Sequence, residues 1–391
     1  MIYLDAAATS NKTQFDEAII NAMTEAMREY WMNPNSLYAS KVRARVDECR
    51  RNIAKTINAE PDEIYFTSGA SESNNWAIRG WVDNWIGGNY MGTVRPHVIT
   101  TSMEHKSIST LMDSGIIDVN AYVQFCGNDE NGLIDYASLV KSLQYCGYDD
   151  NPVLVSICMA NNEIGTIQDI MSISKLVHKH KGVLHMDATQ AYCKMSIDVK
   201  YMGIDMMSVS GHKLSPTLRG IGFLYKKNGV NIDPLIYGAQ ERGLRGGTEN
   251  VAGIVGLNEA LKYCSYDSYK AESITLKRNY LIDRLKTEFD CKLNGDKLHR
   301  LCNNVNVTFP QNITGEALLY MLDMSDIKIA TGSACNSADM TPSHVLKAIG
   351  LSDEEAMRTI RISIDENTTW NEINKFIEEL RKSIEIIESE S

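Results

Sequence analysis

Two ionisable side chains stand directly after short apolar runs, where strands of a buried sheet would end. Asp187 closes the run Val183–Met186, and Lys213 follows the run Met206–Ser210 after a glycine turn. A carboxylate at the end of a buried strand needs a cationic partner or several hydrogen-bond donors. A lysine that is partly removed from water has a lowered pKa, which suits Schiff-base formation and proton transfer. Taken alone, Asp187 is also typical of a helix cap, and Lys213 of a surface lysine.

A third segment, Thr67–Asn74, has the composition of an anion cradle. Small residues such as Ala70 let backbone N–H groups approach an anion, and Ser71 adds a hydroxyl at the start of an expected helix. The same residues would open an ordinary capped helix. His105 follows the apolar run His97–Thr101, and its imidazole is able to stack on a planar ring and to move protons near neutral pH. A merely packed or exposed histidine is the alternative.

Cys335 stands among small polar residues in the segment 329–337 rather than within an apolar stripe. This composition predicts an exposed loop, where a thiol is accessible. The other cysteines, such as Cys158 in an apolar run, are typical of inert core residues. An incidental loop thiol is the alternative interpretation of Cys335.

No single segment decides the chemistry, but their combination is informative. An anion cradle, an acid for a ring nitrogen, a Schiff-base lysine and a stacking histidine are the parts that bind pyridoxal phosphate. Asp187 would keep the pyridine nitrogen protonated, so that the ring accepts electrons. The sequence therefore predicts a pyridoxal-phosphate enzyme with an accessible thiol.

The elements that must position these residues alternate between short apolar runs and amphipathic stretches. This alternation predicts an α/β fold with a largely parallel sheet, which binds ligands at the carboxyl ends of its strands. After Thr248 the pattern changes to long helices around a mixed segment, Asn303–Pro310, with a later helix opened by Thr341-Pro342. We expect a large domain over 13–254 and a smaller α+β domain formed by 1–12 and 255–391. The expected strands of the large domain are Ile64–Thr67, His97–Thr101, Val153–Met159, Val183–Met186, Met206–Ser210 and Ile221–Tyr225.

Composition bounds the class of protein. The 391 residues are 43% hydrophobic and 23% charged, which is ordinary for a globular protein with a sizeable core. The net charge of −11 disfavours nucleic acid or an anionic membrane as the main partner. Nine scattered cysteines without a C-x-x-C pair predict no metal site and a reducing compartment. We expect a cytoplasmic protein with neither a signal peptide nor a membrane span.

At this point the sequence resembles the cysteine desulfurases of the class V aminotransferase superfamily, within the fold-type I pyridoxal-phosphate enzymes. The similarity runs almost end to end, and its cysteine segment resembles the group with the longer catalytic loop. Ser71 stands where the family commonly has threonine, which keeps the hydroxyl. The motifs that carry the resemblance are Tyr3–Asp5, Asn33–Pro34, Phe66–Asn74, Glu104–Lys106, Asn161–Gly165, Asp187–Gln190, Ser210–Lys213, Glu241–Thr248, Gly332–Cys335 and Ile360–Ser363.

Carried over residue by residue, the resemblance implies roles around the cofactor ring. Lys213 forms the Schiff base, Asp187 pairs with the pyridine nitrogen, and His105 stacks on the ring and assists proton transfer. Gln190 and Asn162 hydrogen-bond the ring oxygen or nearby groups. The residues expected to hold the phosphate are Ala70, Ser71, Ser210, His212 and, from the neighbouring subunit, Thr248.

The resemblance also implies a substrate and a product. Asn33, Asn162 and Arg361 hold the carboxylate of L-cysteine, Arg361 with a bidentate fork. Lys213 then removes the Cα proton, and the Cys335 thiolate takes the substrate sulfur to leave L-alanine and a Cys335 persulfide. A cross-subunit Thr248 implies a homodimer. The persulfide would serve a sulfur-acceptor protein, as in iron–sulfur cluster assembly or tRNA thiolation.

Three other functions use parts of the same pattern. A selenocysteine lyase or cysteine-sulfinate desulfinase shares the cofactor site and depends less on Cys335. A plain aminotransferase has no use for Cys335. A non-catalytic assembly subunit would be expected to lack Lys213 or Asp187, and both are present.

Overall fold

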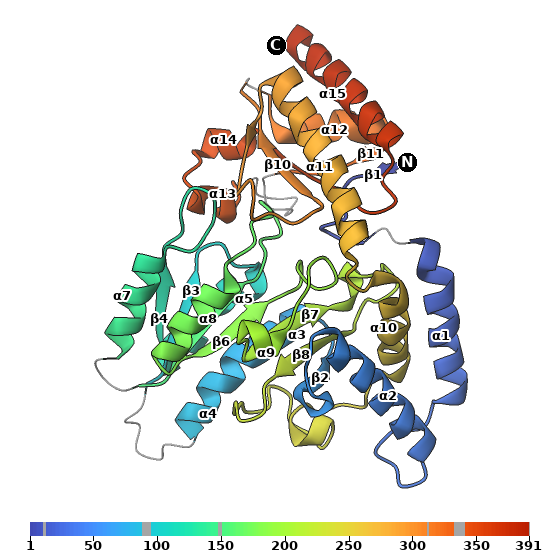
Figure 1. The fold of residues 1–391 in the computed structure, drawn as a ribbon, viewed down its shortest axis with the longest axis vertical. Helices are drawn as coiled ribbons and strands as arrows, with labels where there is room; N and C mark the ends of the chain where they lie inside the picture. Colours follow the sequence, from blue (N-terminus) through green and yellow to red (C-terminus); the bar gives the residue numbers. More distant parts are fainter. Residues whose placement is uncertain (11–12, 88–94, 148–150, 311–312, 332–340, 391) are drawn as a thin grey trace.

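The computed structural model describes residues 1–10, 13–87, 95–147, 151–310, 313–331 and 341–390. Figure 1 shows a large layered body below and a smaller body above, in which both chain termini lie. The expected α/β class with a mainly parallel central sheet is confirmed. Cys335, expected to carry a persulfide, lies outside the described residues.

A seven-stranded sheet forms the centre of the large body, in the order β2-β8-β7-β6-β5-β3-β4. The strands β7, β6, β5, β3 and β4 run parallel, whereas β8 is antiparallel to both of its neighbours, β7 and β2. The carboxyl ends of the parallel strands therefore share one edge of the sheet. The bounds are β2 (Ile64–Thr67), β3 (His97–Thr101), β4 (Tyr122–Cys126), β5 (Val153–Cys158), β6 (Val183–Asp187), β7 (Met206–Ser210) and β8 (Gly222–Lys226).

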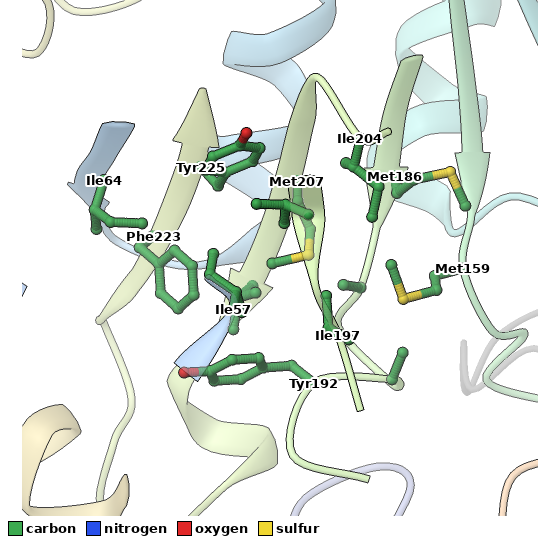
Figure 2. Close-up of a cluster of buried hydrophobic side chains, with 14 of the residues drawn as sticks. Ile57, Ile64, Met159, Met186, Tyr192, Ile197, Ile204, Met207, Phe223 and Tyr225 are labelled. Atoms are coloured by element: carbon green, nitrogen blue, oxygen red, sulfur yellow. The ribbon is translucent and has the colours of Figure 1, made fainter. Parts of the chain in front are cut away.

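Both faces of this sheet are covered, because successive side chains of a strand point to opposite faces. Met207 and Phe223 belong to one buried cluster, while their neighbours Met206 and Leu224 belong to another on the opposite face. Figure 2 shows the first cluster, in which Tyr192 lies beneath Phe223 and Ile57. A sheet that is buried on both faces explains why its strands read as continuous apolar runs.

Helices supply the two outer layers. The first cluster includes side chains of α1 (Asp16–Glu29), α2 (Ser40–Thr56), α7 (Tyr136–Cys146), α8 (Ile170–Lys179) and α10 (Val251–Cys264). The second cluster includes side chains of α4 (Trp81–Gly87), α5 (Lys106–Asp113) and α6 (Ile116–Asn120), together with the π-helical segment Trp76–Gly80 that follows α3 (Ala70–Asn75).

A second, antiparallel sheet forms the upper body, in the order β12-β13-β10-β9. The first strand of the chain, β1, pairs with β11 beside it. Val305 and Ile362 face a separate buried cluster, whereas Asn306 and Arg361 point the other way and contact the Asn162–Glu163 backbone. The elements are β1 (Ile2–Tyr3), β9 (Lys292–Leu293), β10 (Asn304–Thr308), β11 (Ile327–Lys328), β12 (Ala330–Thr331), β13 (Thr359–Ser363), α11 (Ser268–Phe289), α12 (Gly315–Met324), α13 (His344–Ala348), α14 (Asp353–Met357) and α15 (Trp370–Glu390).

The domain division expected at residue 254 stays a prediction. The buried side chains of α10 that follow it, through Cys264, lie in the first cluster of the large body. The N-terminal Ile2 and Leu4 lie in the cluster of the upper body.

The predicted start of one helix was wrong. The helix expected to open at Thr341-Pro342 begins at His344, because Ser343 caps it by accepting from the Val345 and Leu346 N–H groups. Among the described residues, no helix is long and apolar enough to cross a membrane.

A buried ion pair holds the edge strand β2. The Arg50 guanidinium of α2 donates to both carboxylate oxygens of Glu241, at 2.7 and 2.9 Å, and to the Ile64 carbonyl at 2.6 Å. Glu241 also accepts from the Phe66 N–H at 3.2 Å. Glu241 and Arg242 both have positive φ, 45° and 60°, so this turn is strained and depends on its partners.

We therefore expect Glu241→Gln and Arg50→Met each to lower the free energy of unfolding by about 3–5 kcal/mol, because each leaves a buried charge without its partner. The double variant Arg50→Met/Glu241→Met should lose less than the sum of the two single variants. Urea unfolding followed by circular dichroism measures this. As a control, removal of the exposed pair Lys41–Glu29 should change the free energy by less than about 1 kcal/mol. Single variants no less stable than that control would contradict the assignment.

Candidate active site

A cavity of about 350 Å³ lies at the carboxyl ends of β5, β6 and β7, below the polar face of the upper sheet. The side chains expected from the sequence converge there from segments far apart in the chain. Those that line the cavity are Ala70, Ser71, His105, Asn162, Asp187, Gln190, Ser210, His212, Lys213 and Arg361. Of the others, Cys335 lies outside the described residues, and Asn33 and Thr248 are not among the lining residues.

Lys213 follows β7 through the short turn Gly211–Lys213. Its Nζ donates to the carbonyls of Ala7 and Ala8, at 2.8 and 2.7 Å. Burial lowers the pKa of Lys213 to about 7, and the nearby charges of Lys194 and Arg361 lower it further, against the opposing effect of Asp5 and Asp187. A lysine with this pKa is largely available as the neutral amine at physiological pH.

Asp187 ends β6 with its carboxylate fixed on two sides. One oxygen accepts from the Thr189 N–H at 2.9 Å, and the other accepts from the Asn74 amide at 2.8 Å. These bonds orient the carboxylate and leave further lone pairs for a donor in the cavity. The role of Asn74 was not predicted, because in the sequence it reads as a helix residue behind the anion cradle.

His105 caps α5 and presents its ring to the cavity. Its Nδ1 accepts from the Ser107 N–H at 3.1 Å, so in the neutral ring the proton sits on Nε2. His105 keeps contact with solvent, but partial desolvation by the cavity walls lowers its pKa, and the Lys213 charge acts in the same direction while Asp187 opposes it. The ring is therefore neutral at pH 7 and suited to stacking.

The anion cradle forms where β2 turns into α3. Gly69 has φ of 149°, and the Gly222 Cα lies so close that a Cβ there would come within 2.7 Å of the Gly69 Cα. Only glycine at both positions lets the turn lie against β8. Across the cradle, Ser210 Oγ lies 2.8 Å from His212 Nδ1. The Glu72 carboxylate at the rim is neutralised by Arg245, at 2.8 and 3.0 Å.

His212 contributes polarity rather than charge to the cradle. Burial lowers the pKa of His212 to about 4, helped by the charges of Lys213 and Arg219. The neutral imidazole bonds Ser210 through Nδ1, which leaves its other ring nitrogen for a second partner. The cradle therefore offers hydroxyl, imidazole and backbone groups to an anion.

Arg361 enters the cavity from β13 of the upper sheet. Its guanidinium donates to Asp5 at 2.7 Å and to the Asn162 carbonyl at 3.2 Å. Within the described part of the chain, its Nε is buried without a hydrogen-bond partner. Asp5 was not predicted as a site residue, because its position in the sequence carries no local signal of the pairing.

The described ends of the segment that carries Cys335 are both fixed at the site. On one side, Ala330 pairs with Arg361 across β12 and β13. On the other side, the Ser343 hydroxyl donates to the Glu163 carboxylate, and His344 Nε2 lies 2.8 Å from the Glu104 carbonyl. His344 thus contacts the residue next to His105.

Two expected site residues lie elsewhere in this chain. Asn33 is exposed and its side chain accepts from the Asn35 N–H. Thr248 lines a separate surface pocket with Ser68 and Arg245.

The lowered pKa of Lys213 gives a direct test of this environment. The neutral amine is the reactive form, so Lys213 should react with a small amine-directed reagent with a midpoint near pH 7. Lys382, whose pKa Glu379 raises, should react only at much higher pH. Mass spectrometry of peptides after brief labelling of the cofactor-free protein measures both profiles. Identical profiles for the two lysines would contradict the assigned environment.

Comparison with known proteins places this geometry in a family. The family model for class-V aminotransferases matches residues 2–376. The chain is 36% identical to the cysteine desulfurase IscS of Dictyoglomus turgidum, covering 98% of this chain and 94% of the relative. It is 40% identical to the IscS of Clostridium botulinum, again covering 98% and 94%. The solved structure of a NifS-like protein from Rickettsia africae superposes with a TM-score of 0.83 at 28% identity, covering 98% of this chain and 99% of that one.

Enzymes of this family use pyridoxal phosphate. The sequence motifs, the cavity they form and these relatives agree, and the chain belongs to the class-V aminotransferase family and, within it, to the cysteine desulfurases.

Proposed function

We propose that the chain binds pyridoxal phosphate in the 350 Å³ cavity and takes sulfur from L-cysteine, leaving L-alanine and a persulfide on Cys335. The observation that carries the proposal is the convergence of a low-pKa lysine, a fixed carboxylate and an anion cradle on one cavity. The three groups come from β7, β6 and the turn after β2, so local structure alone does not bring them together.

The residues present fit the cofactor. Asp187 is held by two donors and faces the cavity with an acceptor for a pyridinium N–H. Ala70, Ser71, Ser210 and His212 form the phosphate end. The Thr189 hydroxyl is buried without a partner within the described residues, as expected of a side chain that serves a bound group. When bound, pyridoxal phosphate supplies an electron-accepting ring.

The chain's own residues then bind the substrate and move its protons. Lys213, as a neutral amine near pH 7, accepts the proton from the substrate Cα and later returns one. His105, neutral and protonated on Nε2, would stack on the ring, and it would take up a thiol proton at Nδ1, which now accepts from the Ser107 N–H. Asn162 and Gln190 line the cavity beside Asp187 and orient the ring oxygen.

Arg361 is the group proposed to hold the substrate carboxylate. One of its terminal nitrogens is bonded to Asp5, and its Nε is buried without a partner in the described chain. A carboxylate needs two parallel donors from such a fork. The two bonds to Asp5 and Asn162 use two of the five N–H donors of the guanidinium, so donors that include the Nε–H are left for a substrate carboxylate.

Cys335 is the proposed sulfur acceptor. It stands four positions after Thr331 in the sequence, and an extended chain covers at most about 3.6 Å per residue, so its reach from Thr331 is about 14 Å. Thr331 follows Ala330, the partner of Arg361. The thiolate attacks the substrate sulfur, an S–S bond forms as the Cβ–S bond breaks, and the bonding electrons pass to carbon, which gains a proton to become alanine.

Replacement of Cys335 tests this step. Cys335→Ala should keep the visible absorption of the bound cofactor but lower sulfide release from L-cysteine by at least about 100-fold, because the acceptor thiol is gone. Sulfide, alanine and persulfide mass are measured in the presence of dithiothreitol. The partly exposed Cys193→Ala is the matched control and should behave as wild type. Full activity of Cys335→Ala would instead favour a lyase that acts on another substrate.

The enzyme is proposed to act as a homodimer, which would bring Asn33 and Thr248 to the cavity of the partner subunit. Exposed apolar side chains stand on the same two loops as these residues, and we name them the dimer patch: Trp31, Leu37, Tyr38, Ile236 and Tyr237. Asn35 bonds Glu249 beside Thr248, at 3.2 Å, which joins the two loops of the patch. Such a concentration of exposed apolar side chains is typical of an interface.

A charge in this patch should separate the subunits. Leu37 is 96% exposed, and Leu37→Asp should raise the dimer dissociation constant by about tenfold or more and lower cofactor affinity with it. Sedimentation velocity measures the first effect. Leu298→Asp, at a residue 83% exposed in the upper body, is the control. A dimer unaffected by Leu37→Asp would place the interface elsewhere.

The persulfide is proposed to pass to a sulfur-acceptor protein, as in iron–sulfur cluster assembly or tRNA thiolation, in the cytoplasm.

A further inference from the structure

Lys194 lies outside the cavity but is connected to it by a continuous chain of hydrogen bonds. Its Nζ donates to Gln190 Oε1 at 2.9 Å, and Gln190 Nε2 donates to the Ala7 carbonyl at 2.9 Å. The same carbonyl accepts from Lys213 Nζ at 2.8 Å. Lys194 and Lys213 are therefore linked through the Gln190 amide and the Ala7 carbonyl.

These partners fix which way the Gln190 amide faces. An ammonium only donates, so the atom it contacts must be the amide oxygen, and a carbonyl only accepts, so the atom it contacts must be the amide nitrogen. One N–H of Gln190 is committed to Ala7. The second is left for an acceptor in the cavity, which Gln190 lines.

The turn after β6 is built to hold this arrangement. Tyr192 is buried beneath Phe223 in the core, and its hydroxyl lies 2.7 Å from that of Thr56. Cys193 has a φ of 62°, a conformation that a non-glycine residue adopts only when its surroundings impose it. The Tyr192 N–H donates to the Ala188 carbonyl and the Lys194 N–H to the Ala191 carbonyl, so this turn places Lys194, four residues after Gln190, beside its side chain.

Lys194 does not line the cavity itself. It lines a neighbouring pocket of about 60 Å³, and Lys213 lines both that pocket and the cavity. Any effect of Lys194 on a bound ligand must therefore pass through Gln190 or through its charge.

We propose that Lys194 is a positioning residue that holds the Gln190 amide with its N–H toward the cavity, so that it donates to an anionic or phenolic oxygen of the bound cofactor. This inference rests on the proposed function. It adds a residue that acts through another and touches neither cofactor nor substrate.

The charge of Lys194 has a second, separable effect. Burial is the largest cause of the lowered pKa of Lys213, and the charge of Lys194 is the next largest. Removal of that charge should therefore raise the pKa of Lys213, whereas removal of the Gln190 amide should not. The other charged or titratable groups that face Lys213 are Arg361, Asp5, Asp187, His105 and His212.

The experiment is a double-mutant cycle read by cofactor binding. Cofactor-free wild type, Lys194→Met, Gln190→Leu and the double variant are titrated with pyridoxal phosphate, and the visible absorption gives each dissociation constant. Each single variant should bind about tenfold more weakly, because the oriented donor is lost. In the Gln190→Leu background, Lys194→Met should change the constant by less than about twofold. Lys194→Arg, which keeps the charge and the donor, should bind as wild type.

The second readout is the pH dependence of the rate at which the cofactor-free protein takes up pyridoxal phosphate. Its midpoint, set by neutral Lys213, should move to higher pH by roughly half a unit in Lys194→Met and stay unchanged in Gln190→Leu. Lys382→Met, on exposed α15, is the matched control for loss of one lysine. Lys194→Ala is a second truncation with the same expected result, and thermal unfolding checks that each variant is folded.

The outcomes distinguish failure of this inference from failure of the proposed function. If wild type binds the cofactor and Lys194→Met binds within twofold of it, or if the two substitutions are additive, Lys194 does not act through Gln190 and the inference is wrong. If wild type itself acquires no visible absorption, the proposed function is wrong, and the inference is wrong with it.

Discussion

The parallel alignment of β5, β6 and β7 is the constraint on which the site depends. Because the three strands run in one direction and are hydrogen-bonded neighbours, the residues that follow them must emerge at one edge of the sheet. Asn162, Asp187 and Lys213 follow these strands in order. The antiparallel strand β8 completes the edge, since Gly222 lets the turn at Gly69 approach closely enough to form the anion cradle. A one-residue shift in register would turn Asp187 away from the cavity.

The N-terminal segment connects this edge to the upper sheet. Its backbone enters beside β13, where Ala6 and Ala7 bond Ser363, and it then passes over the carboxyl ends of the large sheet. There Asp5 contacts Arg361, and the Ala7 and Ala8 carbonyls accept from Lys213. Within the four consecutive positions 5–8, Asp5 thus contacts Arg361, the group proposed for the substrate carboxylate, and Ala7 and Ala8 contact Lys213. The placement of the upper sheet and the geometry of the lysine are therefore not independent.

The sequence alone predicts the parts of the structure that depend on residues close together in the chain. Buried strands such as Met206–Ser210 read as apolar runs because both of their faces are covered, and their ends located Asp187 and Lys213. The strand Tyr122–Cys126 was missed, since it is an edge strand with Tyr122 and Phe125 exposed, and it lacks an apolar run. The two-residue strands β1 and β11 exist only through their mutual pairing, which has no local signal. The partners of the site, Asp5 for Arg361 and Asn74 for Asp187, are likewise set by contacts between residues far apart in the chain.

Electrostatics explains why the site needs these distant partners. The chain as a whole is acidic, with a net charge of −11, yet the cavity gathers Lys213 and Arg361, with Lys194 behind it. Cations placed together out of water repel one another, and a lysine relieves this by losing its proton, whereas an arginine keeps its own. Burial is the largest cause of the lowered pKa of Lys213, and the charges of Lys194 and Arg361 lower it further, so that the amine is largely neutral near pH 7. Asp5 and Asp187 limit the repulsion without cancelling it. Removal of either carboxylate would therefore change the charge state of Lys213 as well as the contact it makes, and neither residue has a single, separable role.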